Sequence, residues 1–206
     1  MDIFSGAMDY FGRGGGCMWP LLGCSVAAVV IGAERMQYFS KHLTSKKFND
    51  EFADVMNSFN LKGAKELAAK SKGDSAELAK EILAIDENLG DRLESIIYAK
   101  ADRYIEDLED NMSFLNVIIG IAPMMGLLGT ITGMISSFNA LNERTANPMA
   151  VTSGIGEALI TTVFGLIISM IAMCIYAYLS NKIKKASLNI YEVGSILNDI
   201  IKEYHV

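Results

Sequence analysis

The sequence predicts an all-α membrane protein with three membrane-spanning helices. Two observations carry this prediction: the composition is 51% hydrophobic, and the apolar residues gather in three long blocks at 17–33, 114–141 and about 148–179. Each block is close to or longer than the roughly 20 apolar residues that an α-helix needs to cross a bilayer. We therefore expect a multi-pass membrane protein.

The first block predicts a membrane helix over 17–38, after an N-terminal segment at 1–16. A cleaved signal peptide is the alternative interpretation. It is disfavoured because Asp2 and Asp9 stand where a signal peptide carries basic residues.

Basic residues near the helix ends predict the orientation, because Lys and Arg are retained on the cytoplasmic side. The N-terminal segment and the turn at 142–147 have only Arg13 and Arg144. Basic residues follow the first and third blocks, at Arg35, Lys41, Lys46, Lys47, Lys182, Lys184 and Lys185. The N-terminus and the 142–147 turn are therefore expected outside the cytoplasm, and the regions 39–111 and 182–206 in the cytoplasm.

The predicted cytoplasmic region at 39–111 has apolar residues at helical spacing, which indicates amphipathic helices. These residues are Phe48, Phe52, Val55, Met56 and Phe59, and then Leu78, Ile82, Ile85 and Leu89. The stretches "NLKG" ending at Gly63 and "SKGDS" around Gly73 predict the breaks between helices. Asp74 or Ser75 is the expected N-cap of the helix that follows.

Dense charge at 91–110 leads into the second apolar block without an intervening Gly or Pro, so one long helix is expected to enter the membrane. We interpret the acidic cluster in this stretch as a solvated helix face; the alternatives are a cation site or a site for a basic partner. Its members are Glu106, Asp107, Glu109 and Asp110. The amphipathic tail at 182–206 is expected to pack against the cytoplasmic helices or a neighbouring subunit.

Small residues share one face on each of the predicted membrane helices 112–141 and 148–181. They are Ala122, Gly126, Gly129, Thr130, Gly133, Ser136, Ser137 and Ala140 on the first, and Gly154, Ala158, Thr161, Thr162, Gly165, Ser169 and Ala172 on the second. Membrane helices approach closely through such stripes. We interpret Gly126, Gly129, Gly133 and Gly165 as packing residues.

Glu157 is the polar residue that packing does not explain. Asn147 and Pro148 predict the start of the third membrane helix, so Glu157 lies about 14 Å along its axis. A carboxylate at that depth costs about 3 kcal/mol, and such residues face a cavity, a pore or a partner. We interpret Glu157 as functional, whereas Thr130 and Thr162 fit a pore role and hydrogen bonding within their own helix equally well.

The sequence offers no catalytic constellation. His42 and His205 are the only histidines, too few for a metal site. The glycines at 14–16 lack the Lys-Ser/Thr of a phosphate loop. We expect no enzyme activity, no cofactor and no metal. The three cysteines, all in predicted membrane helices, are interpreted as small buried hydrophobes: Cys17, Cys24 and Cys174.

The stretches "IAPMMGLLGTITGMISSF" and "GIGEALITTVFGL" together resemble the paired signature of the MotA/TolQ/ExbB proton channel family. The stretch "GGGCMWPLLGCSVAAVVIGAER", with its Glu34-Arg35 pair, resembles the opening segment of ExbB-type proteins. Three membrane helices and this length are similar to ExbB and TolQ, not to the longer four-helix MotA proteins. Ile171 departs from the pattern, because many ExbB and TolQ chains have proline there, so a kink is expected to be missing.

The resemblance implies a homopentameric ring in the bacterial inner membrane, surrounding an ExbD- or TolR-like partner whose single helix carries a proton-binding aspartate. A TonB- or TolA-like transducer would receive the force, and no nucleic acid is involved. The implied proton pathway includes Thr130, Thr162, Glu157, Thr161 and Ser137.

Three alternatives remain at this stage. One is a TolQ-like subunit for envelope maintenance or gliding, in place of one that energises TonB-like transport. The second is a passive membrane scaffold that anchors a partner. The third is a channel for small solutes.

Overall fold

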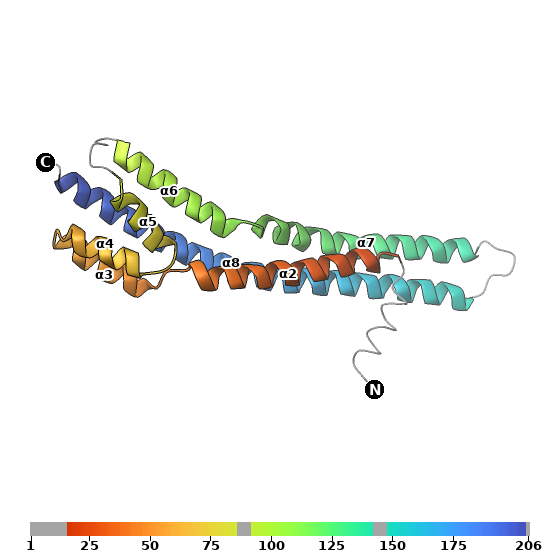
Figure 1. Ribbon diagram of the computed structural model, residues 1–206. Helices are drawn as coiled ribbons and strands as arrows, with labels where there is room; N and C mark the ends of the chain where they lie inside the picture. Colours follow the sequence, from red (N-terminus) through yellow and green to blue (C-terminus); the bar gives the residue numbers. More distant parts are fainter. Residues whose placement is uncertain (1–15, 86–91, 142–147, 205–206) are drawn as a thin grey trace, which may run out of the picture. The chain divides into compact units, whose positions relative to one another are not determined.

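The computed structural model describes residues 16–85, 92–141 and 148–204, and these residues form helices joined by short connections, with no strand among them (Figure 1). The helices are α2 (Met18–His42), α3 (Lys46–Asn57), α4 (Leu61–Lys70), α5 (Asp74–Leu83), α6 (Arg92–Glu109), α7 (Met112–Leu141) and α8 (Pro148–Tyr204). Three segments are long and apolar enough to cross a membrane, and they include α2 and most of α7 and α8. The all-α class and the three membrane helices are therefore confirmed. The predictions for 1–15, 86–91 (Leu89 among them), 142–147 and 205–206 fall outside the described residues.

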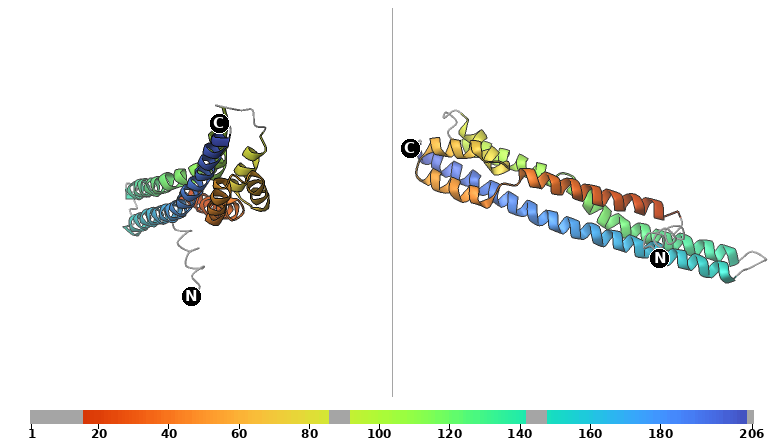
Figure 2. Two further views of the ribbon diagram at one scale, coloured as in Figure 1. Left: turned by 90° about the vertical axis from the view of Figure 1, so that its left-hand side faces the viewer. Right: turned by 60° about the horizontal axis from the view of Figure 1, so that its bottom comes forward.

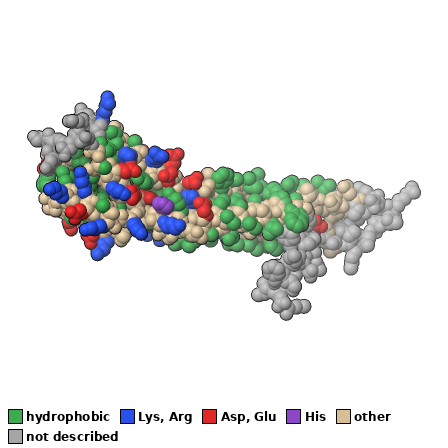
Figure 3. All heavy atoms as spheres, in the orientation of Figure 1, with side chains coloured by type: hydrophobic (Ala, Val, Ile, Leu, Met, Phe, Trp, Pro, Cys, Tyr) green, Lys and Arg blue, Asp and Glu red, His purple; other side chains and the backbone are tan. Residues whose placement is uncertain are grey.

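The chain forms two compact units. The first contains Met1–Ala33 and Asn111–Ala177, and the second contains Glu34–Asp110 and Tyr178–Val206. On the face drawn in Figure 3, acidic and basic side chains gather on the second unit, and hydrophobic side chains cover the first. This distribution agrees with a first unit inside the bilayer and a second unit in water.

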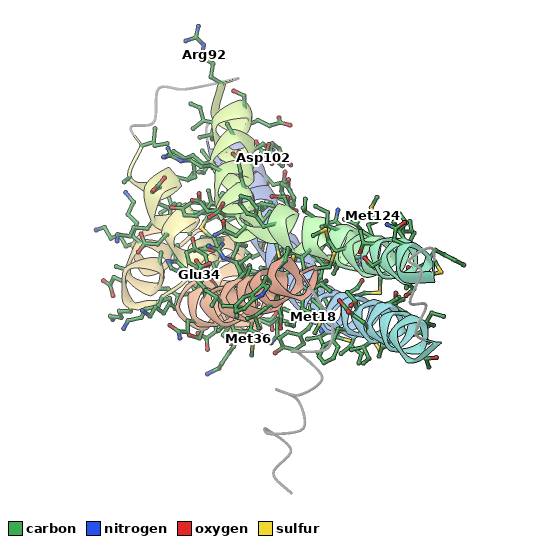
Figure 4. The ribbon with its side chains drawn as sticks, turned by 90° about the vertical axis from the view of Figure 1, so that its right-hand side faces the viewer. Met18, Glu34, Met36, Arg92, Asp102 and Met124 are labelled. Atoms are coloured by element: carbon green, nitrogen blue, oxygen red, sulfur yellow. The ribbon has the colours of Figure 1, made fainter. Side chains whose placement is uncertain are left out.

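The first unit exposes many large apolar residues, unlike a soluble domain, and several of its buried residues are small. Ala28, Ala122, Ala158 and Ala172 are buried. Met124 is 68% exposed and projects from α7 (Figure 4). Further exposed methionines of this unit are Met134, Met170 and Met173. The expected burial of the cysteines is wrong: Cys174 is exposed, and Cys17 and Cys24 are half-buried. Thiols are apolar enough to face lipid as readily as protein.

The expected continuous helix from the cytoplasm into the second block is wrong. Helix α6 ends at Glu109 and α7 begins at Met112. Between them Asn111 has a φ of 59°. Asparagine enters this left-handed region more readily than most non-glycine residues, so it ends a helix where the sequence has neither Gly nor Pro.

The second unit contains α3 to α6 and the end of α8. Its first predicted break lies a few residues earlier than expected, because Phe59 has a φ of 53° and Asn60 caps α4. The Asn60 side chain accepts a hydrogen bond from the Gly63 amide at 2.9 Å, so Gly63 lies inside the helix. The side-chain oxygen of asparagine satisfies a free amide of the first turn and thereby fixes the helix start.

The second break is at Gly73, which has a φ of 107° and caps α5, so the expected N-cap at Asp74 or Ser75 is wrong. The amide of Ser75, in the first turn of α5, instead donates to Thr44 Oγ1 at 3.1 Å. Thr44 belongs to the connection between α2 and α3. A hydroxyl from a distant segment therefore replaces the local cap that the sequence predicted.

The tail at 182–206 is not a separate short helix; its described residues are the last turns of α8, which has 57 residues. Asn49 Nδ2 donates to the Asn189 carbonyl and to Glu192 Oε2, both at 2.9 Å. Tyr191 Oη donates to Asp102 Oδ1 at 2.7 Å. The tail thus packs against α3 and α6, the first of the two packing arrangements expected for it.

The predicted acidic cluster is exposed at its four side chains, as expected, but it also receives a buried arginine. Arg35 is 3% exposed and donates to the Asp107 carbonyl at 3.1 Å and to Asp110 Oδ2 at 3.4 Å. It also pairs with Glu34 at 2.8 Å and lies over the Tyr38 ring. The last turn of α6 is therefore held by a charge from α2.

Candidate functional site

Helices α7 and α8 form an antiparallel pair in the first unit and run side by side in both views of Figure 2. Their contacts join Ile119 to Ser169, Gly126 to Thr162, Gly129 to Thr161, Gly133 to Ala158 and Ser137 to Gly154. Residue numbers fall along α8 as they rise along α7. The small-residue faces predicted from the sequence are therefore the two faces that meet.

The four predicted packing glycines lie at the closest approaches of this pair. A Cβ at Gly165 would stand 2.5 Å from the Ala122 carbonyl oxygen, and one at Gly126 would stand 3.0 Å from Thr162 Cα. At Gly129 it would meet Thr161 Cγ2 at 2.5 Å, and at Gly133 it would meet Ala158 Cβ at 2.9 Å. At Gly165 the facing atom belongs to the backbone, so a larger residue there forces the helices apart.

The two adjacent threonines of α8 have different surroundings. Thr161 is 1% exposed; its Oγ1 donates to the Glu157 carbonyl at 3.0 Å and its methyl group packs on Gly129. Thr162 is half-buried, and its Oγ1 lies 2.9 Å from the Gly126 carbonyl of α7 and 3.4 Å from the Ala158 carbonyl. Thr161 thus lies between the two helices, whereas Thr162 is at their edge and bonds across.

The two predicted α7 residues, Ser137 and Thr130, also differ in how exposed they are. Ser137 is buried against Gly154, and its Oγ donates to the Gly133 carbonyl at 2.9 Å. Thr130 is half-buried, and its Oγ1 donates to the Leu127 carbonyl of its own helix at 2.6 Å. Thr130 and Thr162 are therefore the predicted hydroxyls that remain partly accessible, while Thr161 and Ser137 are enclosed.

Glu157 is half-exposed on α8. The helix begins at Pro148, as the sequence predicted, which places Glu157 nine residues from its start. Within the described part of the chain, no hydrogen bond or ion pair of its carboxylate is found. Carboxylates within membrane spans generally face a cavity, a pore or a partner.

Sequence reasoning missed the role of Ser169, which it placed only among the small residues. Its Oγ donates to the Ile119 carbonyl of α7 at 2.7 Å. The signal was present in the sequence: Pro123 has no N–H to give to that carbonyl. Near Ser169, α8 continues through Ile171 as one helix from Pro148 to Tyr204.

The chemistry available on this pair is that of hydroxyls, backbone carbonyls and one carboxylate. Among the described residues, no group of three or more His, Cys, Asp or Glu side chains is placed to hold a metal ion. Such a surface can bind and pass protons or water by hydrogen bonding. It provides no activated nucleophile.

Residues 54–192 match the family model of the MotA/TolQ/ExbB proton channel family, a match that includes all of α7 and most of α8. The chain belongs to this family. Its family is one of transport proteins and not of enzymes, and it is a multi-pass protein of the inner (cytoplasmic) membrane.

Individual relatives place this MotA/TolQ/ExbB chain on the ExbB/TolQ side of the family. It is 30% identical over 205 residues to biopolymer transport protein ExbB-like 1 of Synechocystis sp., covering 95% of this chain and 79% of the relative. It is 28% identical over 195 residues to ExbB of Salmonella typhimurium, covering 85% and 77%. To TolQ of Haemophilus influenzae it is 37% identical over 83 residues, covering 40% and 36%.

Proposed function

We propose that this chain is the pore-forming ring subunit of a proton-driven motor of the ExbB–ExbD or TolQ–TolR type. In such a motor, the proton motive force moves a partner, which in turn energises TonB-like transport or an envelope process. One observation carries the proposal. In a proton channel family member, an otherwise apolar helix pair presents partly accessible hydroxyls and a carboxylate without a partner in the described chain.

The proposed assembly is a homopentamer with a periplasmic N-terminus, in which α7 and α8 line a central pore. Two observations support further contacts of this helix pair. Gly126, Gly129, Gly133 and Gly165 lie in the contact between α7 and α8 of one chain. Large apolar residues remain exposed on the outside of that pair, where lipid or neighbouring subunits can cover them. The pore would hold a dimer of an ExbD- or TolR-like partner.

The partner would carry the aspartate that takes up and releases the proton. A charge that crosses the membrane potential releases about 2.3 kcal/mol per 100 mV, so each proton can bias only a small displacement. Work accumulates when protonation alternates with movement. The ring supplies the wall along which the partner moves, with Glu157, Thr130 and Thr162 as its polar positions.

The hydrogen bonds of Thr130 and Thr162 indicate which protonation state of the partner's aspartate the ring favours. Thr130 and Thr162 already donate their hydroxyl hydrogens to backbone carbonyls. Each oxygen therefore offers lone pairs, which suit a protonated carboxylic acid as donor. To bind an aspartate anion, a threonine must release its carbonyl and turn its hydrogen to the pore. Proton release by the partner would thus be coupled to a change of hydrogen bond in the ring.

Proton flux into liposomes that contain the chain with its ExbD- or TolR-like partner tests the proposal. The wild-type pair should conduct protons, and Thr162→Val should lose at least about tenfold in flux, because valine keeps the shape and removes the hydroxyl. Ser187→Ala is the matched control, since that hydroxyl bonds only its own helix in the cytoplasmic unit. Wild-type flux in Thr162→Val would refute the pore assignment.

The same liposomes separate the alternatives. A passive scaffold predicts no proton flux with or without the partner. A solute channel predicts leakage of a small dye when the partner is absent. Co-purification with a TolR-like rather than an ExbD-like protein would assign the chain to envelope maintenance or gliding.

A further inference from the structure

Pro123 lies inside α7, in the turn that faces α8. A proline in a helix has no N–H, so the carbonyl four residues earlier loses its donor, and the ring also pushes that carbonyl aside. In α7 this carbonyl is that of Ile119. In the hydrocarbon region no water is available to replace the missing donor.

Ser169 provides the missing donor. Its Oγ lies 2.7 Å from the Ile119 carbonyl oxygen, and the residue is 8% exposed. Hydroxyls inside helices commonly donate to a carbonyl of their own helix. Thr161 and Ser187 do so on α8. Ser169 instead donates across to the one carbonyl of α7 that the proline has left without an amide.

The backbones approach closely at this step. Gly165 lies one turn before Ser169, and a Cβ there would stand 2.5 Å from the carbonyl oxygen of Ala122, the residue before Pro123. Ser169 and Thr162 lie seven residues apart on α8, and their acceptors Ile119 and Gly126 lie seven residues apart on α7. Two bonds of equal spacing therefore fix the register of the pair.

The two acceptor carbonyls differ in whether a second donor remains when the side-chain hydroxyl is lost. The Gly126 carbonyl keeps the amide of residue 130 as a helical donor when the Thr162 hydroxyl is lost. The Ile119 carbonyl has no such second donor. Loss of the Ser169 hydroxyl is therefore the more damaging change to the helix pair.

We propose that Ser169 replaces the backbone donor that Pro123 removes, and that through this bond it is the positioning residue that holds the Thr162 site in register against α7. The bond and its coupling to Pro123 stand independently of the proposed function. The claim that proton flux needs Ser169 rests on the proposed function.

A double-mutant cycle tests the bond in the full-length protein in detergent. Pro123→Ala returns an amide to Ile119, so Ser169→Ala should raise the unfolding equilibrium constant about threefold to tenfold in the wild type and hardly at all in Pro123→Ala. Ser169→Thr and Ser169→Val form an isosteric pair in which only the first keeps the hydroxyl. Thr132→Val is the control, because Thr132 bonds only its own helix.

Hydrogen exchange of the α7 turn around Ile119 gives a local signature. The exchange rate there should rise in Ser169→Val, and it should stay at the wild-type value in Ser169→Thr and in Thr132→Val. Equal effects of Ser169→Ala in both Pro123 backgrounds, or equal exchange in the threonine and valine variants, would overturn the proposal.

Proton flux completes the test. The positioning role predicts loss of flux in Ser169→Val and retention in Ser169→Thr. Normal flux in both variants would refute that role. If the wild-type complex itself conducts no protons, the proposed function fails, and the cycle together with hydrogen exchange decides the inference.

Discussion

Replacing Gly165 with alanine should separate α7 from α8. The new Cβ would stand 2.5 Å from the Ala122 carbonyl oxygen and 3.1 Å from Gly126 Cα, both of them backbone atoms that cannot rotate away. Ordinary contact begins near 3.4 Å, so the helices must move by about 0.9 Å, the difference between 3.4 and 2.5. The change acts on the backbone spacing of the whole pair.

That movement also affects the two bonds across the pair. The Thr162–Gly126 bond is 2.9 Å and the Ser169–Ile119 bond is 2.7 Å, and adding about 0.9 Å takes both beyond good hydrogen-bond length. Overpacking alone costs about 1 to 3 kcal/mol, and the lost bonds add about 0.6 kcal/mol each. We expect Gly165→Ala to lower the free energy of unfolding by about 2 to 4 kcal/mol.

Unfolding in mixed micelles, followed by circular dichroism, measures this change. Gly120→Ala and Gly156→Ala are matched controls, because a Cβ at either glycine would meet nothing within 4 Å. They should be neutral or stabilising by up to about 1 kcal/mol, since alanine favours a helix over glycine. If Gly165→Ala changed the free energy as little as the controls do, the close approach of the backbones would be refuted.

Two further predictions concern the second unit. Burial raises the pKa of Asp74 to about 6, with His42 opposing the shift. The native state therefore holds this proton more tightly than the unfolded state, so stability falls as pH rises from about 4 to 6. Asp74→Asn should remove that fall and raise the free energy of unfolding at pH 7 by about 1 to 2 kcal/mol, after allowance for solvent screening. Thermal unfolding across pH measures this, and a pH profile equal to that of the wild type would contradict the prediction. Arg35→Lys should lower the free energy of unfolding by about 1 to 3 kcal/mol, because an ammonium cannot match the guanidinium's contacts with Asp107 and Asp110. Lys47→Ala, at an exposed residue, is the control and should change it little. Equal losses in the two variants would contradict the prediction.

Much of the fold could be predicted because long apolar blocks have few alternatives in a membrane protein. The start of α8 at Pro148 followed from the proline itself. The breaks between helices were harder to predict, because Phe59 and Asn111 adopt positive φ values where the sequence has no Gly or Pro. Their conformations are selected by neighbouring contacts and caps, which sequence periodicity does not encode.

The candidate site was predictable as a face but not as a set of contacts. Periodicity placed Thr161 and Thr162 on the same side of their helix. Only the structure distinguishes the enclosed Thr161 from Thr162, which bonds across to Gly126. The difference is one residue of helical rotation, and rotation is set by how closely the glycines let two backbones approach.

The exposed methionines of the first unit give its outer surface a mechanical property. Met124, Met134, Met170 and Met173 have unbranched thioether side chains, which change rotamer with little resistance. Valine or isoleucine in their place would form stiff ridges that interlock with a neighbour. The same exposed surface also carries β-branched residues such as Ile135 and Val163, so it can adjust to a neighbour at its methionines while the rest keeps its shape. The closely packed contact between α7 and α8 is thus paired with an outer surface that is adaptable at a few positions.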